Sequence, residues 1–157
     1  MTKLSRLQQG KYKELRVISE LLELGLDVYP AAVDDQGIDC VVRVPHGDQV
    51  AYYDVQIKGY RGYNRVVGVY RKALEQQSPN YLLVLAFFHE TKPDEVFFLT
   101  RDQVLQLKDR AFGKGSNGGW GDLLFNKPER QEFAGQTIER LPEFLRQRRE
   151  ELTQASA

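Results

Sequence analysis

The chain has 157 residues with 22 basic and 22 acidic side chains, so its formal net charge is zero. Hydrophobic residues make up 41% and charged residues 28%, which indicates a folded globular protein and excludes a disordered or fibrous one. The balanced charge excludes a protein held on nucleic acid by bulk positive charge alone, although it allows a local basic surface. A chain of this length can bury about 70% of its unfolded surface, and we expect a single domain over residues 1–157.

The chain has few residues that bind metal through nitrogen or sulfur. Its one cysteine, Cys40, excludes an intramolecular disulfide, and Cys40 with His46 and His89 cannot supply the four ligands of a zinc site. Any metal is therefore expected to be bound through oxygen. The longest apolar run, Tyr81 to Phe88, is too short to span a membrane, and the N-terminus lacks an apolar stretch of signal-peptide length. We expect a cytoplasmic protein without a membrane partner.

Residues 11–24 predict an amphipathic helix that ends at Gly25. At about 100° per residue, its apolar side chains fall on one arc that we expect to be buried, namely Leu15, Ile18, Leu21 and Leu22. Glu14 falls within the same arc, whereas Glu20 and Glu23 fall on the solvent side. One acidic side chain of this helix is therefore predicted to point inward.

Residues 38–44 and 50–57 are strand-like and predict a β-hairpin. If the connection is a two-residue loop of Gly47 and Asp48, the numbers of facing residues sum to 95. One face of the hairpin is then apolar, whereas a shift by one residue would mix polar and apolar side chains. On the other face this register places Asp39 opposite Gln56.

The second half of the chain continues with alternating helices and strands. The pattern predicts a helix near 69–77, a central strand at 80–88, a neighbouring strand at 95–99, a helix opened by a capping box at Thr100–Gln103, and a terminal helix from Pro142 to about Leu152. This order indicates an α/β fold in which a mixed sheet is flanked by helices and the middle helix connects a parallel pair of strands.

Several polar side chains converge on the predicted hairpin and the first helix: Glu14, Asp39, Asp54, Gln56 and Lys58. Carboxylate, carboxamide and backbone oxygens together are typical ligands of a hard cation such as Mg²⁺ or Mn²⁺. A lysine beside such a site can orient a water and stabilise the charge that develops on a phosphate. The combination predicts metal-assisted hydrolysis of a phosphodiester.

These residues resemble the signature of the PD-(D/E)xK nucleases, which include restriction enzymes, Holliday-junction resolvases and some homing endonucleases. The resemblance rests on Glu14 in the first helix, on Gly37-Ile38-Asp39, and on the segment Asp54 to Lys58 in the Q-x-K form of some branches. It covers roughly the first 90 residues and implies a restriction-endonuclease-like αβββαβ core. We expect this core at about residues 10–108, followed by a C-terminal loop and helix extension over 109–157.

The same resemblance implies roles for individual residues. Asp39 matches the metal-binding aspartate and Lys58 the catalytic lysine, while Glu14 matches the helix acid of many members. Glu14, Gln56 and the carbonyl of Ile57 would complete the metal site. Gln56 stands where the family usually has Asp or Glu, so either Asp54 takes over or the site binds metal weakly.

Structural interpretations stand beside these functional ones. Glu14 could pair with Lys11 at a helix edge, Asp39 could form a turn, and Lys58 could be a solvated charge at the end of a strand. The stretch after Lys58 is aromatic and basic, which suits phosphate contact and base stacking as well as a solvated loop; it contains Tyr60, Arg61, Tyr63, Asn64 and Arg65.

The leading hypothesis is a Mg²⁺- or Mn²⁺-dependent DNA endonuclease that acts as a homodimer or a tetramer, because cutting two strands requires two sites. An alternative is a catalytically inactive module of the same fold that binds nucleic acid or regulates a partner. A third hypothesis is a protein-interaction domain whose polar cluster is only structural.

Overall fold

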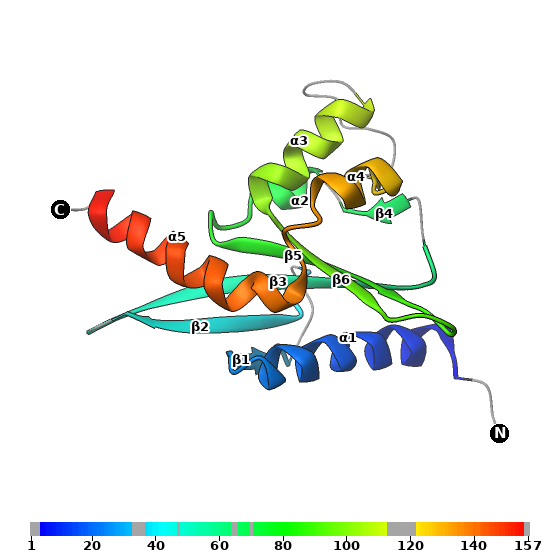
Figure 1. Cartoon of the computed structure of the whole chain (residues 1–157), viewed down its shortest axis with the longest axis horizontal. Helices are drawn as coiled ribbons and strands as arrows, with labels where there is room; N and C mark the ends of the chain where they lie inside the picture. Colours follow the sequence, from blue (N-terminus) through cyan, green and yellow to red (C-terminus); the bar gives the residue numbers. More distant parts are fainter. Residues whose placement is uncertain are drawn as a thin grey trace.

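The computed structural model describes residues 4–32, 37–46, 48–63, 66–69, 71–112 and 122–155. Figure 1 shows the order of its elements. They are α1 (Arg6–Glu23), β1 (Asp27–Pro30), β2 (Cys40–His46), β3 (Gln49–Arg61), β4 (Val66–Gly68), α2 (Arg71–Glu75), β5 (Tyr81–Phe88), β6 (Glu95–Thr100), α3 (Arg101–Phe112), β7 (Asp122–Leu124), α4 (Lys127–Glu132), the 3₁₀-helix η2 (Ile138–Arg140) and α5 (Leu141–Ala155).

A five-stranded mixed sheet forms the centre of the molecule. Its strand order is β1-β2-β3-β5-β6, and β4 and β7 pair in a separate two-stranded sheet. In the central sheet β3 and β5 run parallel, and the other neighbouring pairs are antiparallel. The parallel connection passes through α2, as the sequence predicts. The predicted mixed α/β fold with an αβββαβ order is therefore confirmed.

The hairpin of β2 and β3 has the predicted register. Cys40 lies opposite Val55, and His46 lies opposite Gln49, so two residues connect the strands. Gly47 of this loop lies outside the described residues. Strand β3 continues to Arg61, four residues beyond the prediction, because its far end pairs with β5 as far as Phe88. The extension carries the strand past the proposed site residues.

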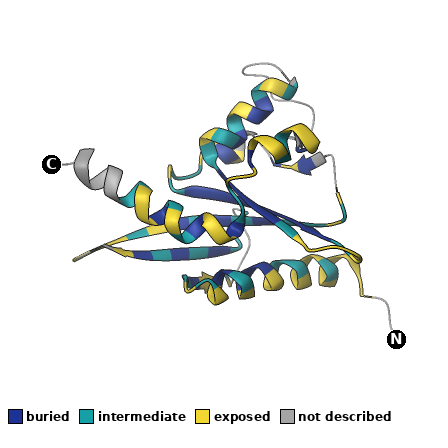
Figure 2. Ribbon diagram, in the orientation of Figure 1, coloured by how far each residue is buried: buried dark blue, intermediate teal, exposed yellow. Residues whose placement is uncertain are grey.

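Two hydrophobic clusters cover the two faces of the sheet (Figure 2). One cluster joins β2, β3 and alternate residues of β5 to α1, η2 and α5. The other joins the remaining residues of β5 to α2, α3 and β7. Every residue of β5 is buried, as expected for a central strand covered on both faces. Val55 and Ile57 belong to the first cluster, so Gln56 and Lys58, which alternate with them, face the side of α2 and α3.

The buried face of α1 differs from the prediction. The helix begins at Arg6, where Ser5 and Gln8 form a reciprocal capping box, five residues earlier than expected. Its buried residues are Val17, Ile18 and Leu21, whereas Leu15 and Leu22 are 50% and 52% exposed. The helix contacts the sheet along a narrower arc than the run of leucines suggests, and Glu14 falls at the centre of that arc.

The C-terminal elements match the predicted order with different limits. Helix α2 is shorter than predicted, whereas α3 extends to Phe112 and its capping box is present: Gln103 Nα donates to Thr100 Oγ1, and Thr100 Nα donates to Gln103 Oε1. In α5, Leu145 is buried as predicted. Three short elements, β4, β7 and α4, were not predicted. None of the helices within the described ranges combines the length and the apolar character that a membrane crossing requires.

Glu20 of α1 provides a test of this packing. The sequence pattern places Glu20 on the solvent side, but the residue is half-buried in the structure. Burial raises the pKa of Glu20, and the negative charges of Glu139, Asp94 and Glu23 raise it further. The positive charge of Arg16 lowers this pKa. A carboxyl with a raised pKa in the folded state destabilises the fold when it is ionised. This destabilisation is absent below about pH 4, where the carboxyl is protonated in both states, and it is complete once the pH has risen through the folded-state pKa. We expect Glu20→Gln to raise the melting temperature at pH 7 and to leave it unchanged below about pH 4, as measured by circular dichroism. Equal effects at both pH values would contradict the assignment.

Candidate functional site

Asp39 lies just before β2, where its backbone and its side chain both bond to β3. Asp39 Nα donates to the carbonyl oxygen of Val55 at 2.9 Å, and Asp39 Oδ2 accepts from Ile57 Nα at 2.5 Å. The Asp39 carboxylate thus extends the hydrogen bonding between the two strands by one step ahead of Cys40, the first residue of β2. Within an antiparallel pair the N–H and C=O of one residue point to the same edge, so the carbonyl of Ile57 lies on the strand edge that meets Asp39.

Gln56 is held in place by contacts at both ends of its carboxamide. Its Oε1 accepts from the hydroxyl of Tyr81 at 2.7 Å. Its Nε2 lies against Gly37, where the backbone has φ of +71° and a Cβ atom would come within 2.4 Å of that nitrogen. Burial, followed by the charge of Asp39, raises the pKa of Tyr81, so the hydroxyl keeps its proton and donates to Gln56. Since a carbonyl oxygen has two lone pairs, Gln56 Oε1 can still accept a second partner.

Lys58 and Asp54 flank Gln56 on the same face of β3. Successive residues on one face of a strand lie about 7 Å apart, so the three side chains form a row of carboxyl, carboxamide and ammonium groups. Both Lys58 and Asp54 are half-buried, and neither has a hydrogen-bond or ion-pair partner among the described residues. Burial raises the pKa of Asp54. An ammonium without a carboxylate partner is available to an anion such as a phosphate.

Glu14 approaches the hairpin from the opposite face of the sheet. It belongs to α1, which packs on the cluster of Cys40 and Val55, and its side chain is 14% exposed and ion-paired with Lys11. Burial, followed by the charges of Asp39 and Glu14, raises the pKa of the Cys40 thiol to about 12. Both carboxylates therefore lie within electrostatic range of that thiol. Among the described contacts, Glu14 makes no hydrogen bond to Asp39, Gln56 or Lys58.

Three oxygen donors of this region are of the kinds that Mg²⁺ and Mn²⁺ prefer, namely the carboxylate of Asp39, the carboxamide oxygen of Gln56 and the backbone carbonyl of Ile57. Gln56 Oε1 is bonded to Tyr81 of β5, and Gln56 Nε2 faces Gly37, so a turn of the carboxamide would be needed to direct its oxygen toward Asp39. Within the described ranges, no three side chains of His, Cys, Asp or Glu come together in a metal-binding group. The candidate centre combines one carboxylate with two neutral oxygens, and such a low ligand charge predicts weak binding of the metal.

The close contact between Gly37 and Gln56 gives a prediction that separates position from stability. Gly37→Ala places a methyl group 2.4 Å from Gln56 Nε2 and imposes a left-handed backbone on alanine, at a cost of about 1–2 kcal/mol. Gly25→Ala has the same backbone cost at φ of +78° but meets no atom within 4 Å. We expect similar losses of thermal stability in both variants and a loss of divalent-metal binding in Gly37→Ala alone, as measured by calorimetry. Equal metal binding by the two would show that the position of Gln56 is unimportant.

The described residues of the basic and aromatic stretch after Lys58 differ in how far they are buried. Tyr60 is half-buried and stacks on Phe87 with ring centroids 6.0 Å apart. Arg61 is exposed and lies 3.7 Å from the carboxylate of Glu90. Tyr63 is exposed and lines a pocket together with residues of β6 and α4. Asn64 and Arg65 lie outside the described residues.

The contribution of Tyr81 was not predicted from the sequence. It lies opposite Asp54 in the parallel pair of β3 and β5, next to Gln56. The only available signal was a hydroxyl at the start of an otherwise apolar strand, and buried hydroxyls need a partner. The parallel register that identifies this partner depends on the crossover and cannot be read from the sequence.

Comparison with known proteins gives a match among solved structures but none among sequences. No protein-family model matches the chain, and no curated protein sequence matches it. Among solved structures, the chain is similar to Archaeoglobus fulgidus Hjc, a Holliday junction resolvase from an archaeal hyperthermophile. The similarity covers 60% of this chain and 74% of that one, with a TM-score of 0.42 and 15% sequence identity.

Proposed function

We propose that this protein is a metal-dependent DNA endonuclease. The observation that supports it is the arrangement just before β2, where the carboxylate of Asp39 accepts from Ile57 Nα. Gln56 and Lys58 lie on either side of Ile57 in β3, and Lys58 has no ion-pair partner among the described residues. Oxygen donors that can hold a divalent cation, with a lysine at an adjacent position, can support metal-assisted hydrolysis of a phosphodiester. The resemblance of these residues to the PD-(D/E)xK signature supports the same proposal, as does the basic and aromatic stretch that follows Lys58.

Each group has a separate role in this proposal. Asp39, Gln56 and Ile57 would hold a Mg²⁺ or Mn²⁺ ion, which when bound polarises the phosphate and makes a water more acidic. Lys58 stabilises the negative charge that develops on the phosphate and orients the attacking water. Glu14 contributes a negative charge from the side of α1. Tyr81 holds Gln56 in position through its hydroxyl.

The proposal is tested with purified protein, supercoiled plasmid and a four-way DNA junction in Mg²⁺, in Mn²⁺ or in EDTA. We expect cleavage in at least one metal and none in EDTA, with Mn²⁺ more effective because the centre has few charged ligands. Cleavage that persists in EDTA would contradict the proposal. Absence of cleavage on both substrates, together with no binding of Mn²⁺ in calorimetry, would also contradict it.

Cutting both strands of a duplex would require two such sites, so we propose a homodimer or a tetramer acting on cellular DNA in the cytoplasm. Light scattering at several protein concentrations measures the mass of the assembly. We expect a dimer or a tetramer, and a monomer at all concentrations would limit the activity to nicking.

A second candidate is a catalytically inactive module that keeps the fold and binds DNA. The neutral Gln56, whose oxygen is already hydrogen-bonded to Tyr81, favours it. Gln56→Glu distinguishes the two, because an added carboxylate tightens a weak site that is otherwise intact. If the protein is an endonuclease, we expect this variant to bind Mn²⁺ about tenfold more tightly and to remain active. Cleavage by the variant alone, with none by the parent, would identify the parent as the inactive module.

A further inference from the structure

A pocket lies beyond the C-terminal end of β3. It has a volume of about 580 Å³, within the range of about 300–1,000 Å³ that is typical of small-molecule sites. Tyr63, the start of β6, α4 and the segment that leads into η2 line it. At about 3.3 Å per residue, Tyr63 is roughly 16 Å along the chain from Lys58. The pocket therefore shares no residue with the candidate metal centre.

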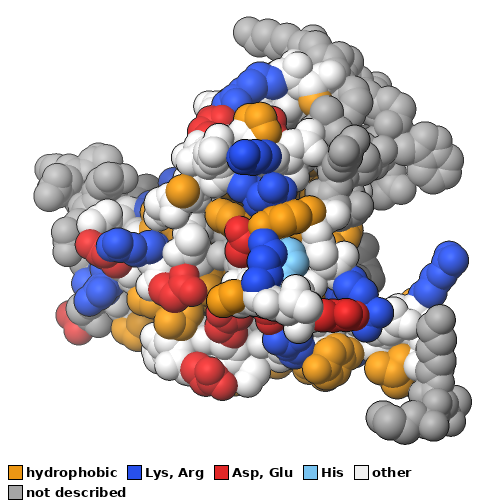
Figure 3. Space-filling view, turned by 45° about the vertical axis from the view of Figure 1, so that its right-hand side comes forward, with side chains coloured by type: hydrophobic (Ala, Val, Ile, Leu, Met, Phe, Trp, Pro, Cys, Tyr) orange, Lys and Arg blue, Asp and Glu red, His pale blue; other side chains and the backbone are white. Residues whose placement is uncertain are grey.

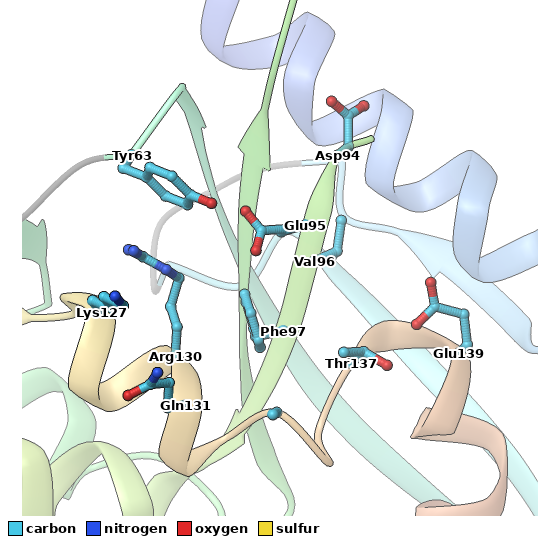
Figure 4. A pocket seen from close by; sticks show the side chains of 11 residues that line it. Tyr63, Asp94, Glu95, Val96, Phe97, Lys127, Arg130, Gln131, Thr137 and Glu139 are labelled. Atoms are coloured by element: carbon cyan, nitrogen blue, oxygen red, sulfur yellow. The ribbon is translucent and has the colours of Figure 1, made fainter. Parts of the chain in front are cut away.

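One side of this pocket is basic and aromatic (Figure 4). The guanidinium of Arg130 lies 3.7 Å from the centre of the Tyr63 ring, and the ammonium of Lys92 lies 4.1 Å from the same ring. Lys92 is ion-paired with Glu95. Neither Arg130 nor Lys127 has a carboxylate partner in the part of the chain that the structure describes. The ring holds Arg130 in place, and its charge stays available to an anion such as a phosphate.

Acidic side chains also line the pocket. Glu95 lies beside the Tyr63 ring and is ion-paired with Lys92 and His89, and Asp94 is ion-paired with Arg16. Glu139 also lines the pocket, and it has no hydrogen-bond or ion-pair partner among the described residues. Figure 4 shows Arg130 and Lys127 on one side of the cavity and Glu139 on the other. Figure 3 shows basic and acidic side chains close together on one face of the molecule, beside hydrophobic ones. A ligand with a negative group at one end and hydrogen-bond donors at the other would match Arg130 and Lys127 on one side and Glu139 on the other.

We propose that this pocket binds one nucleotide, with its phosphate on Arg130 and Lys127 and its base toward Glu139 over the apolar wall of Val96 and Phe97. A carboxylate accepts from the amino groups of adenine, cytosine and guanine. It disfavours thymine, whose single ring N–H lies between two carbonyl oxygens. The nucleotide can come from two sources, a free mononucleotide or an unpaired nucleotide in branched DNA. The proposal goes beyond the endonuclease function, because it needs neither a metal nor Lys58.

The first arm of the test measures binding of deoxyadenosine and thymidine 5′-monophosphates by calorimetry. We expect the adenine nucleotide to bind more tightly than the thymine one. Arg130→Ala should weaken binding of both by about tenfold, and Glu139→Gln should remove the preference for adenine. Arg146→Ala is the matched control, since Arg146 is an exposed arginine of α5 that bonds to the carbonyl of Pro142. Melting curves establish that each variant is folded.

The second arm uses junction DNA with one unpaired deoxyadenosine or an abasic residue at the same position. Arg130-dependent preference for the deoxyadenosine, without binding of the free nucleotide, would identify DNA as the source. Binding of the free nucleotide that depends on Arg130 would identify the mononucleotide. The proposal is overturned if neither ligand binds, or if folded Arg130→Ala binds as the parent does. Asp39→Asn is expected to bind the mononucleotide normally, so failure of the endonuclease proposal and failure of this one are distinguishable.

Discussion

Asp39→Asn is expected to abolish metal-dependent DNA cleavage while the fold is retained. Asparagine has the same shape, and its Oδ1 can accept the hydrogen bond that Ile57 Nα donates to Asp39 Oδ2. The substitution removes the one carboxylate of the candidate centre. A bound metal contributes several kcal/mol to the stabilisation of the transition state, so we expect the cleavage rate to fall by at least about 100-fold. Calorimetry should show loss of Mn²⁺ binding in parallel.

The matched control for this variant is Asp48→Asn. Asp48 is exposed in the turn of the same hairpin, so the chemical change is identical and the site is distant from the centre. We expect it to cleave DNA at the rate of the parent. Normal cleavage by a folded Asp39→Asn variant would show that Asp39 is a structural residue that completes the hairpin.

Lys58→Met is expected to abolish cleavage through a different step. Methionine keeps a long side chain in this half-buried position but removes the ammonium charge. Since a lysine is not a ligand of the metal, Mn²⁺ binding should persist, whereas stabilisation of the phosphate charge is lost. We expect the cleavage rate to fall by about 100-fold or more, with binding of Mn²⁺ retained in calorimetry.

A control for the loss of positive charge is Arg146→Met on the exposed surface of α5. It removes one charge from α5, which covers the face of the sheet opposite to that of Lys58, and should leave both cleavage and metal binding unchanged. A similar small decrease in both variants would indicate that Lys58 acts only through general attraction of DNA. A loss of Mn²⁺ binding in Lys58→Met would contradict the division of roles between Asp39 and Lys58.

The local part of the fold was predictable from the sequence. The hairpin register followed from the alternation of polar and apolar residues, and the observed pairing of Cys40 with Val55 confirms it. The continuous apolar run of β5 predicted a strand covered on both faces. The limits of α1 were wrong because the capping box at Ser5 and Gln8, which fixes its start, lies ahead of the apolar pattern.

The long-range contacts of the site were not predictable. The Tyr81–Gln56 hydrogen bond depends on the parallel register of β5, which only the folded crossover defines. The prediction that Leu15 and Leu22 are buried was wrong. A hydrophobic arc shows which side of a helix is apolar, but the part of that side that is buried depends on how the helix packs on the sheet. The pocket at Tyr63 brings together Arg130 and Glu139, which are far from it in sequence.

The most direct test of the endonuclease proposal is a time course of nicking of supercoiled plasmid by the parent protein in Mn²⁺, stopped by EDTA and restarted with excess Mn²⁺. The proposal predicts that nicking stops and resumes with the metal in the parent and is absent from folded Asp39→Asn and Lys58→Met. Nicking that continues in EDTA, or that occurs at the parent rate in both variants, would contradict it.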